Sequence, residues 1–431
     1  MKRSITRRRM LQTSAAVTTG LWLGTAARSR AGDSPNEKLS IACIGIGGQG
    51  RSNVDGTGKH ENIVALCDVD EQRAGNAFEK YPKAKRFVDF RKMFDALEKE
   101  IDAVTISTPD HTHFHPALWA MTRGKHVYLE KPLAHNVWEV RELTKLAAEK
   151  KLATQLGAQR HAISGLRAGV EIARSGVLGE ITEVHSWIGG DRGMPKLPTD
   201  TPPVPSHVNW DLWLGPAKER PYHPTYCPYG WRFWWDFGTG ETGNWGCHIL
   251  DIPFWALDLK SPTRVEASGP AVHDETTPKA LHAVYQFPAS EKRGPVTLHW
   301  HHTKTDPPVL AEHGAKGDGF NTFFIGKKAS LLCGFGKWKL VGEQDFEGYK
   351  PPKTFQDSPG FHKEWLSAIR GGEPATCNFD YTGPLTETVL LGNVAYRAGE
   401  AFDWDAENLK AVGSEKAQGL LREEYRKGWE T

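Results

Sequence analysis

The chain has 431 residues and nearly balanced charge, with 54 Lys and Arg against 52 Asp and Glu. A chain of this length exceeds what one hydrophobic core usually organises, so two domains are expected. Residues 1–31 hold seven basic residues and no acidic ones, and without them the net charge is −5. That charge excludes the basic surface with which proteins bind nucleic acid or anionic membranes. Six cysteines are too few for a disulfide scaffold, and burial as small hydrophobic residues is expected for all six.

The first 31 residues resemble an export signal. A basic stretch contains the pair Arg7 and Arg8, an apolar run extends from Ala15 to Ala27, and Ser29–Ala31 offers a cleavage site. This pattern is typical of a twin-arginine signal, which predicts recognition by the twin-arginine export machinery and a periplasmic destination. The apolar run is too short and too interrupted to span a membrane, so the mature form should have no membrane anchor.

Strands and helices alternate over residues 38–157, which we interpret as the first domain. Short apolar runs predict buried strands at Leu39–Ile46, Ile63–Cys67, Ala103–Ser107, Val127–Leu129 and Ala153–Leu156. The intervening patterns predict helices at Asp70–Lys80, Pro116–Arg123 and Trp138–Lys150. This alternation predicts the α/β class, with a doubly wound parallel sheet of the Rossmann type.

A glycine-rich turn follows the first predicted strand. Gly45, Gly47 and Gly50, with Gln49 between them, have the spacing G-x-G-x-x-G. Such glycines allow a tight turn, a close approach of the backbone to a pyrophosphate, and close packing of the next helix. The pattern after a strand therefore predicts a dinucleotide site.

The residue that ends the second predicted strand bears on the choice of nucleotide. Asp68 stands where a carboxylate accepts hydrogen bonds from the adenosine ribose and repels a 2′-phosphate, which favours NAD over NADP. Arg51 lies beside the glycine turn and could bind a 2′-phosphate, so NADP stays possible.

Thr108 and Pro109 end the next strand, at the sheet edge that lies near the cofactor in this fold. The alternate histidines His111, His113 and His115 follow. On an extended strand they would share one face and could hold a metal ion. They follow a proline, however, precede a helix and lack a carboxylate at a suitable spacing. We therefore assign no metal site to the sequence.

Lys131 is the best-supported catalytic candidate. Pro132 disfavours a helical conformation for the residue before it, so Lys131 should be extended at the carboxyl edge of the sheet. A partly desolvated ammonium group near a positively charged nicotinamide has a lowered pKa and can exchange a proton with a substrate hydroxyl. Glu130 would orient Lys131 or the cofactor.

The composition changes after Gly157, and residues 158–431 are interpreted as a second domain. A helix is predicted at Arg167–Ser175 and loops at Gly193–Pro224. Predicted strands are Ile181–Ile188, Leu281–Phe287, Val296–His301, Phe323–Ile325 and Ser330–Cys333, and later helices are Phe361–Arg370 and Leu385–Gly399. This order predicts an α+β domain with a large, mostly antiparallel sheet.

A second group of candidate residues lies in this domain. Asn244 and His248 are four residues apart, so on a helix they share one face. An amide can bind a substrate hydroxyl but cannot take a proton, which leaves His248 as the candidate base. Many aromatic residues precede this segment and most should be core. Among them, Trp235 could stack on a sugar and Arg232 could bind its hydroxyls or a carboxylate.

The glycine turn, the Glu-Lys-Pro sequence at Lys131 and the Asn244–His248 segment together resemble the Gfo/Idh/MocA family, which includes glucose–fructose oxidoreductase and inositol dehydrogenase. The resemblance covers Lys38–Trp429 and extends to a C-terminal region typical of exported bacterial members. The family usually has Asp where this chain has Asn244, which puts the usual proton relay in doubt.

The resemblance also implies further site residues and an activity. It implies that His113 lies near the nicotinamide and that Gln159 and Arg160 face the active site. The implied activity is NAD(P)-dependent oxidation or reduction of a CH–OH group of a sugar, polyol or glycoside, by a homo-oligomer.

Export narrows the chemistry, because free NAD is scarce outside the cytoplasm. A tightly bound NAD that is reduced and reoxidised in each turnover removes this difficulty. Oxidoreduction between two sugars and redox-neutral glycoside cleavage both satisfy it. A non-catalytic, sugar-binding accessory protein is a third interpretation, and Asn244 is its only support in the sequence.

Overall fold

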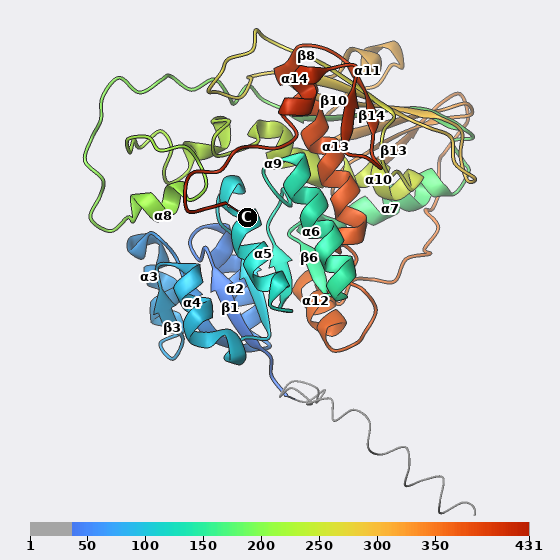
Figure 1. Cartoon of the computed structure of the whole chain (residues 1–431). Coiled ribbons are helices and arrows are strands. Elements are labelled where there is room, and N and C mark those ends of the chain that lie inside the picture. Colours follow the sequence, from blue (N-terminus) through green and yellow to red (C-terminus); the bar gives the residue numbers. More distant parts are fainter. Residues whose placement is uncertain (1–36, 431) are drawn as a thin grey trace, which may run out of the picture. The chain divides into compact units, whose positions relative to one another are not determined.

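Two β-sheets organise the computed structural model, which describes residues 37–430 (Figure 1). The predicted export signal in residues 1–31 lies outside the described residues. The first sheet has the strand order β3-β2-β1-β4-β5-β6 and the second has the order β13-β12-β11-β7-β10-β9-β8-β14-β15. The predicted class, a Rossmann sheet followed by an α+β domain with a mostly antiparallel sheet, is confirmed.

All strands of the first sheet are parallel. They are β1 (Ser40–Ile44), β2 (Asn62–Cys67), β3 (Lys85–Phe87), β4 (Ala103–Ile106), β5 (His126–Leu129) and β6 (Thr154–Leu156). The helices between them are α2 (Gln49–Gly58), α3 (Glu71–Lys80), α4 (Phe90–Leu97), α5 (Phe114–Thr122) and α6 (Val137–Lys150). Most side chains of the central strands are buried, because helices cover a parallel sheet on both faces.

The prediction missed one strand and one helix of the first domain, β3 and α4. The three residues of β3 are exposed or half-buried, so they carry no apolar pattern. Helix α4 follows Asp89, whose side chain accepts a hydrogen bond from the amide of Arg91. This N-cap was the available signal for α4.

The second sheet is antiparallel except between β7 (Ile181–Gly189) and β10 (Val296–Thr303), which are parallel. Its other strands are β8 (Arg264–Ser268), β9 (Leu281–Phe287), β11 (Thr322–Gly326), β12 (Ser330–Cys333), β13 (Trp338–Val341), β14 (Phe402–Asp405) and β15 (Lys410–Val412). The predicted limits of β9 and β12 match the observed ones.

Helices of the C-terminal half contact this sheet and also return to the first one. They are α7 (Ser164–Arg174), α8 (Trp210–Leu214), α9 (Gly240–Ile249), α10 (Asp251–Leu257), α11 (Pro308–Glu312), α12 (Phe361–Ile369), α13 (Phe379–Ala398) and α14 (Glu415–Gly419). Helix α13 packs against β8 and β9 on one side and α6 on another, and α12 packs against α2. Trp365 of α12 donates its indole hydrogen to the carbonyl of Ala153 at 3.1 Å.

Helix α13 begins six residues before the predicted start at Leu385. Its N-cap is Asn378, whose side chain accepts a hydrogen bond from the amide of Tyr381 at 3.2 Å. Pro384 lies inside the helix. The predicted helix began directly after this proline, and that start was wrong.

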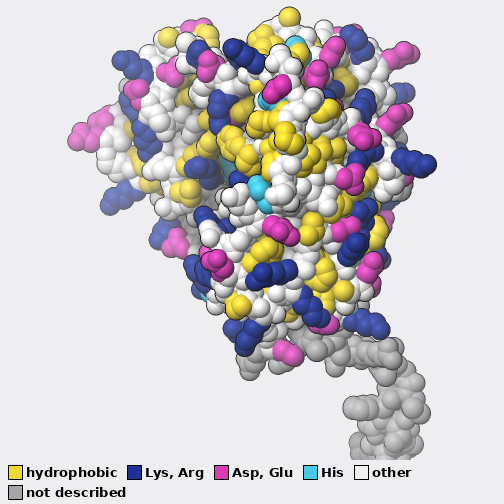
Figure 2. Space-filling model, turned by 90° about the vertical axis from the view of Figure 1, so that its left-hand side faces the viewer, with side chains coloured by type: hydrophobic (Ala, Val, Ile, Leu, Met, Phe, Trp, Pro, Cys, Tyr) yellow, Lys and Arg dark blue, Asp and Glu magenta, His cyan; other side chains and the backbone are white. Residues whose placement is uncertain are grey.

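The surface and the cysteines agree with the expectations from composition. All six cysteines are buried and none forms a disulfide. Acidic and basic side chains are interspersed on the face shown in Figure 2, around a gathering of hydrophobic side chains. Among residues 37–430, no helix combines the length and apolarity that crossing a bilayer requires.

Candidate active site

A cavity of about 450 Å³ lies at the carboxyl ends of the strands of the first sheet, between them and segments of the second domain. Most predicted site residues line it: Gly45, Gly47, Gln49, Asp68, Thr108, Pro109, Glu130, Lys131, Gln159, Arg232, Asn244 and His248. Four others, Gly50, His113, Arg160 and Trp235, are not on its wall. The structure therefore brings residues far apart in the chain to one site, as the fold rule for open parallel sheets predicts.

The glycine turn closes tightly against the end of β4. Gly45 has φ +73°, and a Cβ on it would lie 2.7 Å from the carbonyl carbon of Ser107. A Cβ on Gly50 would lie 1.9 Å from the carbonyl oxygen of Gly45. Only glycine fits at both positions, and the resulting turn brings bare backbone and the N-terminus of α2 to the cavity. This cradle suits a pyrophosphate.

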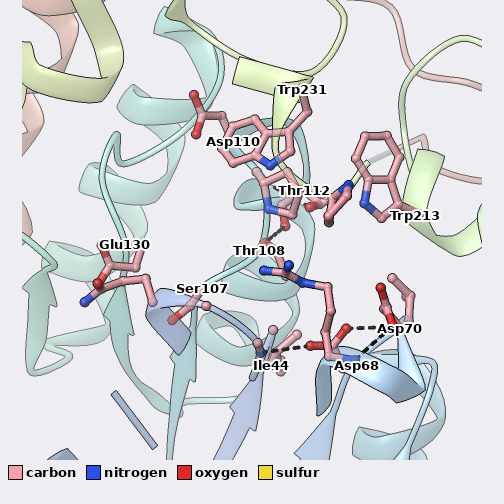
Figure 3. A pocket seen from close by; sticks show the side chains of 18 of the residues that line it. Ile44, Asp68, Asp70, Ser107, Thr108, Asp110, Thr112, Glu130, Trp213 and Trp231 are labelled. Atoms are coloured by element: carbon pink, nitrogen blue, oxygen red, sulfur yellow. Dashed lines mark hydrogen bonds between the residues drawn. The ribbon is translucent and has the colours of Figure 1, made fainter. Parts of the chain in front are cut away.

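Asp68 holds the glycine turn as well as lining the cavity (Figure 3). Its Oδ2 accepts hydrogen bonds from the amides of Ile46 at 2.8 Å and Gly47 at 3.2 Å, and its Oδ1 accepts one from Asp70 at 3.0 Å. Burial raises the pKa of Asp68 above its ordinary 3.8. The carboxylate is therefore fixed in place before any ribose hydroxyl reaches it.

The cation nearest the turn is Arg73 rather than Arg51. A Cβ on Gly48 would lie 3.1 Å from Nη2 of Arg73, and Arg73 lines the cavity. Arg51 is exposed on α2 and is not on the wall. Any 2′-phosphate that enters the cavity would meet Arg73 in addition to Asp68.

We expect the protein to bind NAD more tightly than NADP, by a factor on the order of 10, because a hydrogen bond to a charged group contributes roughly 1.5–3 kcal/mol. Dissociation constants for both nucleotides measure this preference. Arg73→Ala should widen it by weakening NADP binding, whereas the matched variant Arg51→Ala should leave both constants unchanged. Equal affinity for the two nucleotides in the wild type would show that Arg73 outweighs Asp68.

Lys131 bridges the two domains inside the cavity. Its Nζ donates hydrogen bonds to the backbone carbonyl of Asn244 at 2.8 Å and to Oδ1 of Asn244 at 2.9 Å. Burial lowers the pKa of Lys131 below its ordinary 10.5, and the charge of Arg232 lowers it further, while Asp110 and Glu130 act in the opposite direction. The amine is thus held in place and is easier to deprotonate than an exposed lysine.

The side-chain amide of Asn244 has a defined orientation. Its oxygen faces Lys131, and its Nδ2 donates to Oε1 of Glu241 at 3.2 Å. Glu241 is 2% exposed and its Oε2 forms an ion pair with Arg192 at 2.7 Å. A buried carboxylate therefore stands one helical turn before Asn244. The sequence interpretation missed it, although the spacing Glu-x-x-Asn on a helix was a usable signal.

His248 lies on the cavity wall with an unused nitrogen. Within residues 37–430 its Nδ1 has no hydrogen-bond partner. Burial lowers the pKa of His248 well below its ordinary 6.5, and the charges of Lys131 and Arg160 add to this effect. The ring is therefore neutral near pH 7 and can accept a hydrogen bond from a ligand.

Contacts of Glu130, Gln159 and Arg160 hold neighbouring elements in place around the cavity. Oε1 of Glu130 accepts hydrogen bonds from Asn53 and from Gln159, both at 2.8 Å. The guanidinium of Arg160 lies 5.1 Å from the ring centre of Trp245, the neighbour of Asn244 on α9. These contacts hold α2 and α9 relative to the end of β5, so they position the residues that face the cavity.

The three alternate histidines do not converge. Both ring nitrogens of His113 face carbonyl oxygens, of Pro132 at 2.7 Å and of Thr108 at 2.9 Å, so this residue ties together the loops that carry Thr108 and Lys131. Both nitrogens of His111 face the carbonyls of Phe237 and Trp213, and Nε2 of His115 faces the carbonyl of Trp429. All three histidines are buried and tie loops to the backbone.

The cavity also holds residues that the sequence interpretation did not single out. Asp110 is buried and accepts hydrogen bonds from the amide of Thr239 at 3.2 Å and its hydroxyl at 2.6 Å. Thr112, Trp213, Tyr229, Trp231 and Trp429 complete the wall opposite the glycine turn. In Figure 3, Asp110, Trp213 and Trp231 lie across the cavity from Asp68.

The two candidates of the aromatic segment, Arg232 and Trp235, lie in different places. The guanidinium of Arg232 is on the wall, 4.6 Å from the ring centre of Tyr229 and 4.1 Å from that of Trp231. Trp235 lies away from the cavity, where its indole donates to the carbonyl of His273 at 3.1 Å. Within this segment, the aromatic residues on the wall are therefore Tyr229 and Trp231.

The C-terminal segment reaches back to the first domain. Trp429 lines the cavity, and its carbonyl faces Nε2 of His115 at 2.8 Å. The guanidinium of Arg91 lies 4.6 Å from the ring centre of Trp429. Part of the cavity wall is thus built by Trp429, which lies 298 positions after Lys131 in the chain.

Two family models match the chain. Residues 39–158 match the model described as an oxidoreductase family with an NAD-binding Rossmann fold. Residues 180–323 match the model described as an oxidoreductase family, C-terminal alpha/beta domain. The first match spans β1–β6, and the second begins just before β7 and ends within β11.

Two curated relatives and one solved structure illustrate the similarity. 2,7-Anhydro-N-acetylneuraminate hydratase of Escherichia coli K12 is 24% identical over 154 residues, covering 35% of this chain and 40% of that protein. Inositol 2-dehydrogenase of Rubrobacter xylanophilus is 31% identical over 162 residues, covering 36% and 45%. The chain thus spans less than half the length of these relatives. The WlbA dehydrogenase of Bordetella pertussis, in complex with NADH and UDP-GlcNAcA, has the same fold, with a TM-score of 0.63, 14% identity, and coverage of 86% of this chain and 99% of that chain.

Proposed function

Because the chain belongs to the Gfo/Idh/MocA oxidoreductase family, we propose that it oxidises or reduces a CH–OH group of a sugar, polyol or glycoside with NAD. One observation carries this proposal. A single cavity joins the glycine turn, Lys131 and His248. A nucleotide cradle and two proton-handling groups in one cleft are what hydride chemistry on an alcohol requires.

The residues of the cavity fit a dinucleotide. The turn at Gly45 and Gly50 leaves no room for a Cβ, which lets a pyrophosphate approach the backbone. Asp68 would hold the ribose, and Thr108 and Pro109 would border the nicotinamide end. Bound NAD would supply the hydride acceptor or donor.

The chain's own residues would manage the proton. In the direction of oxidation, the substrate hydroxyl would give its proton to Nζ of neutral Lys131 or to the neutral ring of His248. Asn244 keeps Nζ in place through its two oxygens. Arg232 and the aromatic rings beside it would bind the remaining hydroxyls and the faces of the sugar ring.

We also propose that the protein is exported through the twin-arginine machinery and acts in the periplasm, as a homo-oligomer that keeps its NAD bound and reoxidises it in each turnover. Fractionation of cells that express the Arg7→Lys, Arg8→Lys variant tests export, and retention of this variant in the cytoplasm is expected. Size-exclusion chromatography with light scattering tests the oligomer.

Redox-neutral glycoside cleavage is the second candidate function. One relative is named a hydratase, a name that describes no net oxidation. A bound NAD that is reduced and reoxidised within one turnover serves both functions equally well. The accessory-protein alternative is weaker, because Asn244 still binds Lys131 despite replacing the family's usual Asp.

Two measurements on the purified full-length chain test these functions. Denaturation should release NAD or NADH, identified by mass. Incubation with sugars and glycosides should then yield either an oxidised sugar with a reduced partner, or a free sugar with no net redox change. A protein that binds no nucleotide and converts no substrate would leave only the accessory role.

We expect Asn244→Asp to move the pH dependence of the reaction upward. The new carboxylate would lie where Oδ1 now stands 2.9 Å from Nζ of Lys131, so it would raise the pKa of Lys131. Because the basic amine exists only above its pKa, the rising limb of kcat/KM should shift to higher pH. The control is the double variant Asn244→Asp, Glu241→Gln. It removes the carboxylate of Glu241, whose Oε1 lies 3.2 Å from Nδ2 of Asn244, so that the new carboxylate at position 244 does not face a second one. An unchanged pH profile would show that Lys131 is not the titrating group.

A further inference from the structure

Four histidines gather on the face of the second sheet that points away from α9. Trp300 of β10 donates its indole hydrogen to Thr242 of α9, so its sequence neighbours His299 and His301 point to the opposite face. The parallel pairing of β10 with β7 places His185 beside His299. The antiparallel pairing of β10 with β9 places His282 beside His301. Three strands thus contribute imidazoles to one patch.

The four rings form two stacked pairs. The rings of His185 and His299 have centres 4.2 Å apart at an angle of 6°, and those of His282 and His301 have centres 4.3 Å apart at 7°. Across the stacks, Nδ1 of His185 lies 3.0 Å from Nε2 of His301, and Nε2 of His282 lies 3.1 Å from Nδ1 of His299. Four ring nitrogens therefore face one another in two adjacent pairs.

Glu183 determines which nitrogens are available. Its Oε1 lies 2.7 Å from Nε2 of His185 and 3.3 Å from Nε2 of His299. A carboxylate accepts hydrogen bonds, so it holds hydrogen on both Nε2 atoms and leaves Nδ1 of each ring with its lone pair toward the cluster. Carboxylates orient metal-binding histidines in this way in known sites.

Burial keeps these histidines neutral. It lowers the pKa of His185 and of His299 to about 4 and that of His301 to about 2, and repulsion among the rings adds to the effect. Neutral imidazole is the form that coordinates a metal ion.

We propose that His185, His299 and His301, supported by His282 and Glu183, bind one divalent transition-metal ion such as Zn²⁺. Nitrogen atoms of the first three residues lie within 4.8 Å of one another. Zn–N bonds of about 2.0–2.1 Å separate tetrahedral ligand nitrogens by about 3.3 Å. The three rings now lie within 15° of parallel, so they would rotate to direct their lone pairs at one ion. To coordinate through Nε2, neutral His301 carries its hydrogen on Nδ1 instead, so the tautomer changes and no proton is released to solvent.

The site has an entrance and a structural consequence. Side-chain exposure is 40% for Glu183 and 16% for His299, so an ion can enter from solvent on that side. Bound there, it would join β7 to β10, and through His282 it would hold β9. The cluster uses none of the cavity residues, so the ion would stabilise the second domain without entering the reaction.

Zinc binding to the untagged, full-length chain tests the proposal. After treatment with a chelator and its removal, the protein is titrated with Zn²⁺ by calorimetry and its metal content is measured after desalting. About one ion per chain and a raised midpoint of thermal unfolding are expected. The His185→Gln, His299→Gln variant should lose at least a factor of about 100 in affinity, and Glu183→Gln a factor of about 10–100. His60→Gln, at an exposed turn of the first domain, is the matched control and should bind Zn²⁺ like the wild type.

Cobalt gives a readout that does not depend on the folding of any variant. Co²⁺ bound to the wild-type chain by nitrogen ligands in tetrahedral geometry should show the intense d–d absorption of that geometry, and Zn²⁺ should abolish it. A wild-type chain that retains no zinc after desalting would overturn the proposal and leave a hydrogen-bonded imidazole cluster. Unchanged affinity in the His185→Gln, His299→Gln variant would overturn it as well.

Discussion

Lys131→Met is expected to lower kcat by a factor on the order of 10² or more, the usual size of a general acid–base contribution. Methionine keeps the length of the side chain but cannot take or give a proton. It would also leave both oxygens of Asn244 without their present donor. NAD affinity should change little, because the cradle is built by the glycine turn and Asp68.

Steady-state kinetics with the substrate found by the function assay, together with NAD titration, measure both effects. The exposed helical residue Lys145 offers a control of the same side-chain type, and Lys145→Met should behave as the wild type. If kcat of Lys131→Met remained close to wild type, the proton would have to pass through another group, and His248 would be the remaining candidate.

His248→Ala is expected to lower kcat by a similar factor, on the order of 10². The variant removes the free ring nitrogen from the cavity wall and opens a small space beside Lys131. Because burial holds the pKa of His248 well below 6.5, the wild-type rate should show no histidine limb between about pH 6 and pH 7. A limb there would indicate that the ring titrates and that its surroundings differ from the structure.

Measuring kcat and the nucleotide dissociation constants of His248→Ala separates a role in catalysis from a role in cofactor binding. Nucleotide dissociation constants should be the same for His248→Ala and the wild type, since His248 lies on α9 rather than at the glycine turn. The surface variant His60→Ala controls for loss of a histidine as such. A loss of NAD affinity equal to the loss of kcat would assign His248 to the cofactor site instead.

The sequence predicted the Rossmann sheet well because its strands are short apolar runs bounded by glycines and charged residues. It predicted Lys131 and His248 because each stands in a local motif. The interpretation missed Glu241 although the spacing Glu-x-x-Asn was a usable signal. The sequence could not predict Asp110, whose importance comes from the approach of the start of α9 to the end of β4, a contact between residues more than 100 positions apart. Local patterns carry no information on such pairings.

Two groups of histidines show the same limit of prediction from local sequence. His111, His113 and His115 attract attention as a run, yet each faces backbone carbonyl groups and their rings do not converge. His299 and His301 alternate along one strand, but their partners His185 and His282 are supplied by strand register. Register in a sheet of nine strands depends on the whole topology.

The position of Trp429 in the cavity wall has a consequence for biosynthesis. A ribosome that has made residues 40–157 has made every strand of the first sheet, yet the wall remains open until the segment around Trp429 emerges. The cavity wall is therefore complete only after the segment around Trp429 has left the ribosome, long after the strands of the first sheet. A fusion partner or affinity tag placed directly after this segment would follow a residue that lines the cavity, so expression vectors for this protein should carry their tags elsewhere.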